Sequence, residues 1–299
     1  MTKAILMYHR VCARTEDTAC YFERGTAVTP EAFRAQLRWL AERYVFRTVR
    51  DLVFGERNEH PTVALTFDDG YRDVVEHVFP VCRELGAVAT VYVCTSTLPP
   101  GADPLWFDRY YAMVPQLQAG FEATAVRDIL ATECNERPPD SSLRWWVRGP
   151  LKARLAGLAR DARGRLLERL EAALGVSSVP SASIGYLDRQ DLSSLMSVGW
   201  EIGGHGAHHD RLTDLHPTTL AAELSASSQM LVELGQRKPR TIAYPDGALD
   251  QRVVAAAAAW FEAGVTVSSE LFDSTHPQLR LPRLLCRGEG EVPHPSLMR

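Results

Sequence analysis

Short continuous apolar runs recur along the chain. They occupy residues 4–11, 63–65, 88–94, 200–202 and 241–243, and several of them close on charged residues, histidines or glycines. Apolar runs of this length, without strict alternation, are typical of parallel strands that are buried on both faces. The hydrophobic pattern therefore predicts a central parallel sheet.

Segments with helical periodicity lie between these runs. Phe33, Leu37 and Leu40 recur at helical spacing after Thr29-Pro30, where threonine is a typical N-cap and proline a typical first helical residue. Strands that alternate with helices predict a wound or barrel-like α/β domain with its site at the carboxyl ends of the strands. Further helices are predicted over residues 49–54, 71–85, 189–198 and 217–234.

Bulk composition is that of a globular protein. The 299 residues are 45% hydrophobic and 23% charged, so the chain can bury a large core in one elaborated domain or in two. A net charge of -4 gives no sign of a nucleic-acid or anionic-membrane partner. We find no basic-plus-apolar leader, no apolar run long enough to span a membrane and no Cys-x-x-Cys pair among six scattered cysteines. A cytoplasmic protein without a membrane span is expected.

Two adjacent carboxylates follow the apolar run 63–65, in the sequence Thr66-Phe67-Asp68-Asp69-Gly70. Neighbouring side chains at the end of a strand point to opposite sides. Asp68 and Asp69 can therefore take different roles, one holding a metal and the other handling a proton. A solvated Asp-Asp-Gly turn is the alternative interpretation.

Three histidines lie within five residues after the run 200–202. His205 and His209 are four apart, and on one turn of helix this spacing places both rings on one face, which suits chelation of a single ion. With a carboxylate they would form a two-histidine, one-carboxylate set that leaves coordination positions open for water and substrate. The pattern favours a metal site.

These two stretches resemble the motifs of the polysaccharide deacetylase superfamily, carbohydrate esterase family 4, which includes the nodulation-factor deacetylases. The resemblance spans most of the chain and implies a distorted (β/α) barrel. It implies that Asp68 is the catalytic base and that Asp69, His205 and His209 bind a divalent metal. Zinc is the metal that the resemblance favours, although such a site also accepts Co²⁺, Ni²⁺ or Fe²⁺.

A subgroup of this superfamily carries the strand with the general acid at the front of the chain, with a Tyr-His pair. Met7-Tyr8-His9 is similar to that arrangement, so His9 is expected to be the general acid, and a structural histidine is the alternative. The segment 241–247 resembles a third motif, in which an arginine braces the catalytic aspartate. Here Ala243 replaces that arginine. Arg283 stands where the subgroup often has an arginine, and it is either the brace or a surface cation.

The third motif also implies a backbone N–H that stabilises the oxyanion, here from Asp246, which replaces the usual aromatic residue. The Asp246 carboxylate could instead face the substrate, and Tyr71 and Tyr244 are further candidates for the oxyanion or substrate site. In the histidine motif, Gly206 replaces a serine or threonine whose hydroxyl ties the loop to its own backbone. This departure leaves His208 as a second-choice ligand.

Residues 99–183 interrupt the alternation of strands and helices. We interpret them as a mostly helical insertion on the rim, ending in the charged stretch 151–174, so that residues 1–98 and 184–299 form the barrel. The insertion could set substrate size or mediate homodimerisation. Its aromatic residues could stack on sugar rings or pack between helices; they include Trp106, Phe107, Tyr110, Tyr111, Trp145 and Trp146.

The resemblance implies hydrolysis of an N-acetyl group from an N-acetylated amino sugar. The expected lack of export favours a nucleotide-linked or lipid-linked sugar, or a small precursor, over a wall polymer. A cytosolic amidohydrolase acting on a cyclic imide, ureide or N-formyl group is an alternative, because the same groups hydrolyse any suitably placed amide. A non-catalytic carbohydrate-binding homologue is a second alternative, supported only by Gly206 and Ala243.

Overall fold

The chain forms two compact units in a computed structural model. The first unit is Met1–Ala102 with Gly185–Arg299, and the second is Asp103–Ile184. The described residues are 2–56, 59–120, 124–134, 146–147, 149–176, 184–238, 240–268 and 270–298.

An eight-stranded parallel sheet forms the centre of the first unit. Its order is β10, β1, β5, β6, β7, β8, β9, and β4 pairs with the start of β5. The strands are β1 Lys3–Tyr8, β4 Val45–Arg47, β5 Thr62–Phe67, β6 Ala89–Val93, β7 Glu201–Gly204, β8 Thr241–Ala243, β9 Ala263–Val265 and β10 Leu284–Leu285. A separate two-stranded sheet pairs β2 (Arg10–Val11) with β3 (Ala27–Val28).

The two ends of the large sheet approach each other through residues 281–285. Leu281 pairs with Val265 at the end of β9, and β10 pairs with β1. The backbone N–H of Ser268 also donates to the Arg283 carbonyl, over 3.0 Å. The sheet therefore curls back on itself, and the prediction of a distorted α/β barrel is confirmed.

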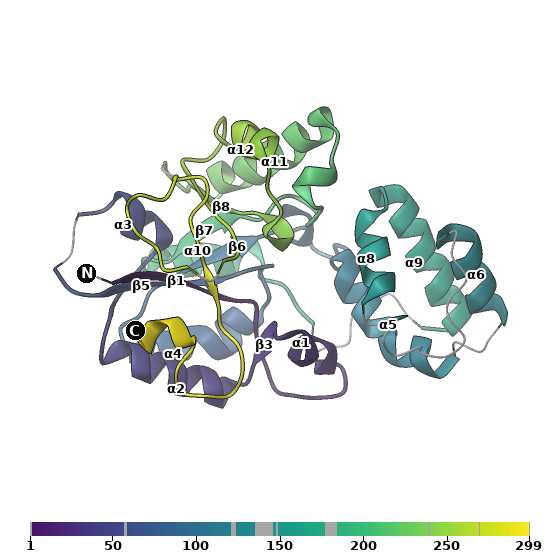
Figure 1. The fold of residues 1–299 in the computed structure, drawn as a ribbon, viewed down its shortest axis with the longest axis horizontal. Coiled ribbons are helices and arrows are strands. Elements are labelled where there is room, and N and C mark those ends of the chain that lie inside the picture. The colour runs from purple at the N-terminus through teal and green to yellow at the C-terminus, as the bar shows by residue number, and fades with distance from the viewer. Residues whose placement is uncertain are drawn as a thin grey trace. The chain divides into compact units, whose positions relative to one another are not determined.

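Helices cover the sheet of the first unit. Figure 1 shows α2 and α4 on one side of the strands and α11 and α12 on the opposite side. The α-helices are α1 Ala19–Arg24, α2 Pro30–Ala41, α3 Val49–Phe54, α4 Phe79–Glu84, α10 Arg189–Ser197, α11 Pro217–Glu233 and α12 Gln251–Ala257. Short 3-10 helices cover Thr95–Thr97, Leu212–Asp214, Pro245–Gly247 and Pro295–Met298. None of the helices that the structure describes is long and apolar enough to cross a membrane.

Local sequence explains where α2 begins and why the segment 74–84 departs from a regular α-helix. The hydroxyl of Thr29 accepts a hydrogen bond from the Ala32 N–H and Pro30 is the first residue of α2, as predicted. The helix expected over residues 71–85 is instead the π-helix Val74–Val78 followed by α4. Pro80 has no N–H and its ring clashes with the carbonyl one turn earlier, which accounts for the wider turn before it.

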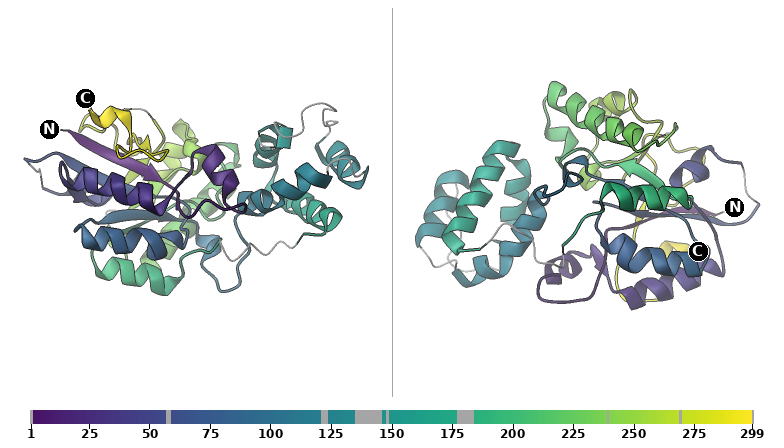
Figure 2. Two further views of the ribbon diagram at one scale, coloured as in Figure 1. Left: turned by 90° about the horizontal axis from the view of Figure 1, so that it is seen from below. Right: turned by 180° about the vertical axis from the view of Figure 1, so that it is seen from behind.

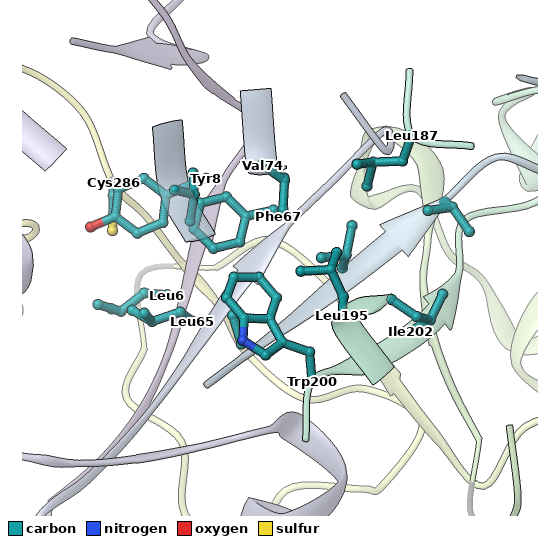
Figure 3. Close-up of a cluster of buried hydrophobic side chains, with 14 of the residues drawn as sticks. Leu6, Tyr8, Leu65, Phe67, Val74, Leu187, Leu195, Trp200, Ile202 and Cys286 are labelled. Atoms are coloured by element: carbon teal, nitrogen blue, oxygen red, sulfur yellow. The ribbon is translucent and has the colours of Figure 1, made fainter. Parts of the chain in front are cut away.

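Strand alternation determines which side chains reach the site. Leu65 and Phe67 of β5 face the core cluster between the sheet and the helices, which Figure 3 shows in close-up. Ala64 belongs to a second cluster on the inner face of the sheet. Because successive side chains of a strand point to opposite faces, Thr66 lies on the inner face with Ala64, and Asp68 is the next residue of that series.

The second unit is helical in its described residues. It contains α5 (Trp106–Gly120), α6 (Thr124–Cys134), α8 (Pro150–Gly157) and α9 (Arg160–Leu174). Helix α9 packs against α5 and α6, and Figure 2 shows these helices in teal. Arg109 of α5 and Glu171 of α9 form a two-point ion pair, with N–O distances of 3.0 and 2.8 Å.

The aromatic residues of the second unit lie in its interior. Trp106, Phe107, Tyr110, Tyr111 and Trp146 are each at most 9% exposed, and Trp145 lies outside the described residues. The Phe107 ring contacts the rings of Trp106 and Tyr111, with centroids 5.7 and 6.0 Å apart. Burial of this kind favours packing between helices over stacking on a sugar.

Candidate active site

The two adjacent aspartates occupy the turn after β5. The Asp68 N–H donates to the Tyr8 carbonyl over 3.0 Å, which continues the pairing of β5 with β1. Asp69 and Gly70 then adopt φ angles of 72° and 76°. A non-glycine residue in this left-handed region costs about 1–3 kcal/mol and persists where its surroundings hold it. The turn gives the two buried carboxylates different directions.

The histidines lie on a loop after β7. The His205 N–H donates to the Val93 carbonyl over 3.0 Å and so extends the pairing of β7 with β6. Gly206 and His209 adopt φ angles of 72° and 56°. Because of these left-handed residues, the segment is a loop and not a turn of helix. The loop nevertheless brings the two imidazole centroids to 4.9 Å.

Asp69, His205 and His209 form a compact set of ligand atoms. Asp69 Oδ1 lies 3.4 Å from His205 Nε2 and 3.3 Å from His209 Nε2. One ligand atom from each of the three buried residues lies within 4.8 Å of the other two. His208 is turned away from this set, with its Nδ1 2.7 Å from Glu223 Oε1.

The chemistry of these atoms fits a divalent cation. Asp69 Oδ1 is buried without a hydrogen-bond partner among the described residues. His205 Nδ1 lies 2.8 Å from the Ala243 carbonyl, which fixes the ring so that Nε2 is the nitrogen left for a metal. Two imidazole nitrogens and one carboxylate oxygen are common ligands of zinc and of other first-row metals.

Neighbouring charges shift the pKa values of the buried groups in this cluster. Burial acts to raise the pKa of Asp69, but the imidazoles of His205 and His209 hold it well below the usual range. Burial acts to lower the pKa of His205, but the two carboxylates raise it overall. The two carboxylates thus favour a positive charge on the His205 imidazole. A bound cation would take the place of a proton on the imidazole, because metal ligands must be deprotonated.

Asp68 is paired with a single buried cation. Arg283 Nη1 and Nη2 lie 2.6 and 2.8 Å from the two carboxylate oxygens, and Arg283 is 0% exposed. Arg283 also donates to the Thr66 hydroxyl and the Thr266 carbonyl, both over 3.0 Å. Burial acts to raise the pKa of Asp68, but the Arg283 guanidinium lowers it overall. Asp68 is therefore held ionised and in a fixed orientation.

His9 lies between β1 and β2, and the residue before it, Tyr8, pairs with Phe67, the residue before Asp68. The His9 Nδ1 is buried without a hydrogen-bond partner among the described residues. A positive charge on His9 is close enough to contribute to the lowered pKa of both Asp68 and Asp69, after burial and their nearer partners. The structure thus brings His9 to the site of the two aspartates.

Asp246 lies in the turn after β8. It is exposed and adopts a φ of 55°. The preceding strand residue, Ala243, supplies the carbonyl that contacts His205. The turn therefore follows directly from a strand that reaches the histidine cluster.

The two candidate tyrosines are both buried. Tyr71 is 1% exposed and stacks on Tyr186, with ring centroids 5.5 Å apart. Tyr244 is 0% exposed, belongs to the core cluster and donates its hydroxyl to the Leu279 carbonyl over 3.0 Å. The Tyr244 hydroxyl is therefore already bonded within the core.

One residue that contacts the histidine loop was not expected from the sequence. Glu223 lies on α11 and its carboxylate reaches the backbone of the loop. The signal that could have identified it is an acidic residue on the apolar face of a helix, between Leu220 and Leu224. A buried carboxylate at such a position needs strong hydrogen-bond partners.

The comparison with family models identifies the chain. The model described as polysaccharide deacetylase matches residues 55–114 and 176–264, which include both aspartates and the histidine loop. The chain belongs to the polysaccharide deacetylase family. Membership implies a hydrolase that removes acetyl groups from sugars. The residues of this family member that the model matches do not include His9 or Arg283.

Solved structures share the fold of this family member. The Streptococcus pyogenes deacetylase PplD in complex with acetate is 20% identical, with a TM-score of 0.65 over 100% of this chain and 97% of that one. A polysaccharide deacetylase from Bacillus cereus is 16% identical, with a TM-score of 0.59 over 95% and 65%. IcaB from Ammonifex degensii is 15% identical, with a TM-score of 0.58 over 97% and 94%. No curated protein sequence matches the chain.

Replacement of Arg283 by methionine should destabilise the protein by about 3–5 kcal/mol at pH 7, because it leaves Asp68 buried and unpaired. The pairing with Arg283 lowers the pKa of Asp68. Its stabilising effect is therefore complete above the ordinary aspartate pKa of about 4 and is lost as the pH falls through the lower, folded value. The difference in the free energy of unfolding between the wild type and the variant should shrink as the pH is lowered. Urea unfolding at pH 7 and at an acidic pH below about 4 measures this difference.

Arg189→Met is the matched control, because Arg189 forms an exposed ion pair with Glu233. We expect this control to change the free energy of unfolding by at most about 1 kcal/mol. An Arg283→Met variant as stable as the control, or with the same deficit at both pH values, would contradict the assigned role of the buried pair.

Proposed function

We propose that the protein is a metal-dependent N-deacetylase of an N-acetylated amino sugar. One observation carries the proposal: Asp69, His205 and His209 converge, with Asp68 beside them, in a member of the polysaccharide deacetylase family. Zinc is the metal we expect, and cobalt, nickel and iron suit the same ligands. The cytoplasmic location and a homodimer stay predictions.

Asp69, His205 and His209 would hold the cation. When bound there, a divalent cation polarises an acyl carbonyl and lowers the pKa of water. Asp68 then accepts the proton of the water that attacks the acetyl carbon. Because Arg283 lowers the pKa of Asp68, this carboxylate is a weak base whose main asset is its fixed orientation. A weak base of this kind would suit a water whose pKa a bound cation lowers.

Two further groups complete the proposed reaction. The backbone N–H of Asp246 stabilises the negative charge that develops on the carbonyl oxygen, a contribution commonly of about 3 kcal/mol per donor. His9 protonates the departing nitrogen, which is a poor leaving group as an anion. The products are acetate and a free amino sugar.

The function is tested with N-acetylated sugars as substrates. The purified protein should contain a divalent metal, release acetate, lose activity with a chelator and regain it when zinc is added. Asp68→Asn should lower kcat by about 10²–10⁴-fold, the usual contribution of a general base, and keep the metal. Asp273→Asn, which changes an exposed aspartate, is the matched control and should leave kcat unchanged.

Three results would contradict the proposal. The first is a wild-type protein that binds no metal or is indifferent to chelators. The second is an Asp68→Asn variant that keeps full activity. The third is turnover of a cyclic imide, ureide or formamide without turnover of any N-acetyl sugar. That result would make the protein an amidohydrolase of a different substrate class.

The role of His9 is tested by a change of leaving group. His9→Ala should lower kcat on an N-acetyl sugar by about 10²–10⁴-fold, because the amine needs a proton to leave. The same variant should hydrolyse an aryl acetate nearly as fast as the wild type, because a phenolate leaves without one. His216→Ala, at an exposed helix start, is the control. Equal losses on both substrates would assign His9 a structural role.

A further inference from the structure

The backbone between the two metal-ligand candidates is short and contains few side chains. Gly206, Ala207 and His208 separate His205 from His209. Gly206 has no side chain, and its φ of 72° disfavours any other residue there. The N–H and carbonyl groups of this loop must therefore find partners on other elements.

Glu223 supplies the acceptor for the N–H groups. Its Oε2 accepts from the Ala207 N–H over 2.8 Å and from the His208 N–H over 3.1 Å. Its Oε1 lies 2.7 Å from His208 Nδ1. Glu223 is 3% exposed, so these bonds form away from solvent. One buried carboxylate on α11 therefore bonds two consecutive amides and one ring of the loop.

The carbonyl groups of the same loop are bonded from the other side. The Thr95 N–H donates to the Gly206 carbonyl over 3.4 Å, and the Ser96 N–H donates to the Ala207 carbonyl over 2.9 Å. Both donors belong to the 3-10 helix Thr95–Thr97 that follows β6. The loop is therefore clamped between a carboxylate on one element and two amides on another.

The residue that follows this clamp, His209, has an unusual backbone conformation. His209 adopts a φ of 56°, in the left-handed region that is uncommon for residues other than glycine. Residues in such a conformation persist only where the surrounding structure determines them. The bond from the His208 N–H to Glu223 fixes the residue immediately before His209. Release of that bond would allow the backbone at His209 to relax and its imidazole to turn away from Asp69.

We propose that Glu223 is a positioning residue, which holds the histidine loop so that His209 presents its Nε2 beside Asp69. The inference rests on the proposed function, since it concerns the same metal-ligand set. Glu223 belongs to α11 and does not itself lie in the set of ligand atoms. The carboxylate performs by long-range contact what a hydroxyl at position 206 would perform locally.

The test is the affinity of the metal-free protein for zinc, measured by competition with a chromophoric chelator. Glu223→Ala should bind zinc about 10–100-fold more weakly than the wild type, the usual effect of removing a group that orients metal ligands. Glu223→Gln should lose less, because one oxygen still accepts from the two amides. His208→Ala should also lose less, because the two backbone bonds to Glu223 remain.

Glu233→Ala is the matched control, because Glu233 lies on the same helix but forms an exposed ion pair with Arg189. It should bind zinc as the wild type does. If Glu223→Ala does not fold, Glu223→Gln is used with amide hydrogen exchange of the metal-free protein. In that variant a neutral amide oxygen replaces the carboxylate and accepts more weakly. The amides of Ala207 and His208 should therefore exchange faster than in the wild type, while the amides of β5 should not change.

The outcomes separate this inference from the proposed function. Weaker zinc binding in the order Glu223→Ala, Glu223→Gln, wild type supports it. Wild-type zinc affinity in Glu223→Ala, whatever its melting temperature, overturns the positioning role and leaves the metal site intact. A wild-type protein that binds no zinc overturns the proposed function and this inference together.

Discussion

The ion pair between Asp68 and Arg283 connects the closure of the barrel to the chemistry of its site. Arg283 lies in the segment 281–285, which pairs with β9 on one side and with β1 on the other. The same residue places a fully buried guanidinium against a carboxylate at the end of β5. Burial of an unpaired carboxylate would cost several kcal/mol. The segment that closes the sheet thus supplies the positive charge that a buried, ionised Asp68 requires.

This pairing gives the adjacent aspartates different chemical states. Asp68 has its charge matched by a permanent cation, and it cannot easily serve as a metal ligand because both of its oxygens bond Arg283. Among the residues that the structure describes, no arginine or lysine forms an ion pair with Asp69. Its Oδ1 faces two imidazole nitrogens, so that only a proton or a metal ion can balance the charge there. One pairing therefore divides two identical side chains into a candidate base and a candidate ligand.

Much of this arrangement could be predicted from local sequence. The apolar run before Asp68 predicts a buried strand, and the N-cap at Thr29 predicts the start of α2, because both depend on near neighbours. The conformation of the histidine loop could not be predicted by spacing alone, since four-residue spacing also suits a helix. It depends on left-handed backbone at Gly206 and His209.

Contacts between distant segments were harder to predict from the sequence. Glu223 reaches the loop only after α11 has packed against β7, and no local pattern specifies which amides it will bond. Arg283 and Asp68 are 215 positions apart, and only resemblance suggested their meeting. The π-helix before Pro80 is an intermediate case, because the proline is visible in the sequence but its effect on the hydrogen-bond pattern is not.

We propose that three residues from two distant segments, Asp69, His205 and His209, hold one cation. X-ray absorption of the zinc-loaded protein measures the ligands directly. We expect two imidazole nitrogens at about 2.0–2.1 Å from the metal and carboxylate or water oxygens at about 2.0–2.2 Å. Scattering from sulfur at about 2.3 Å, or the absence of imidazole scattering, would contradict it.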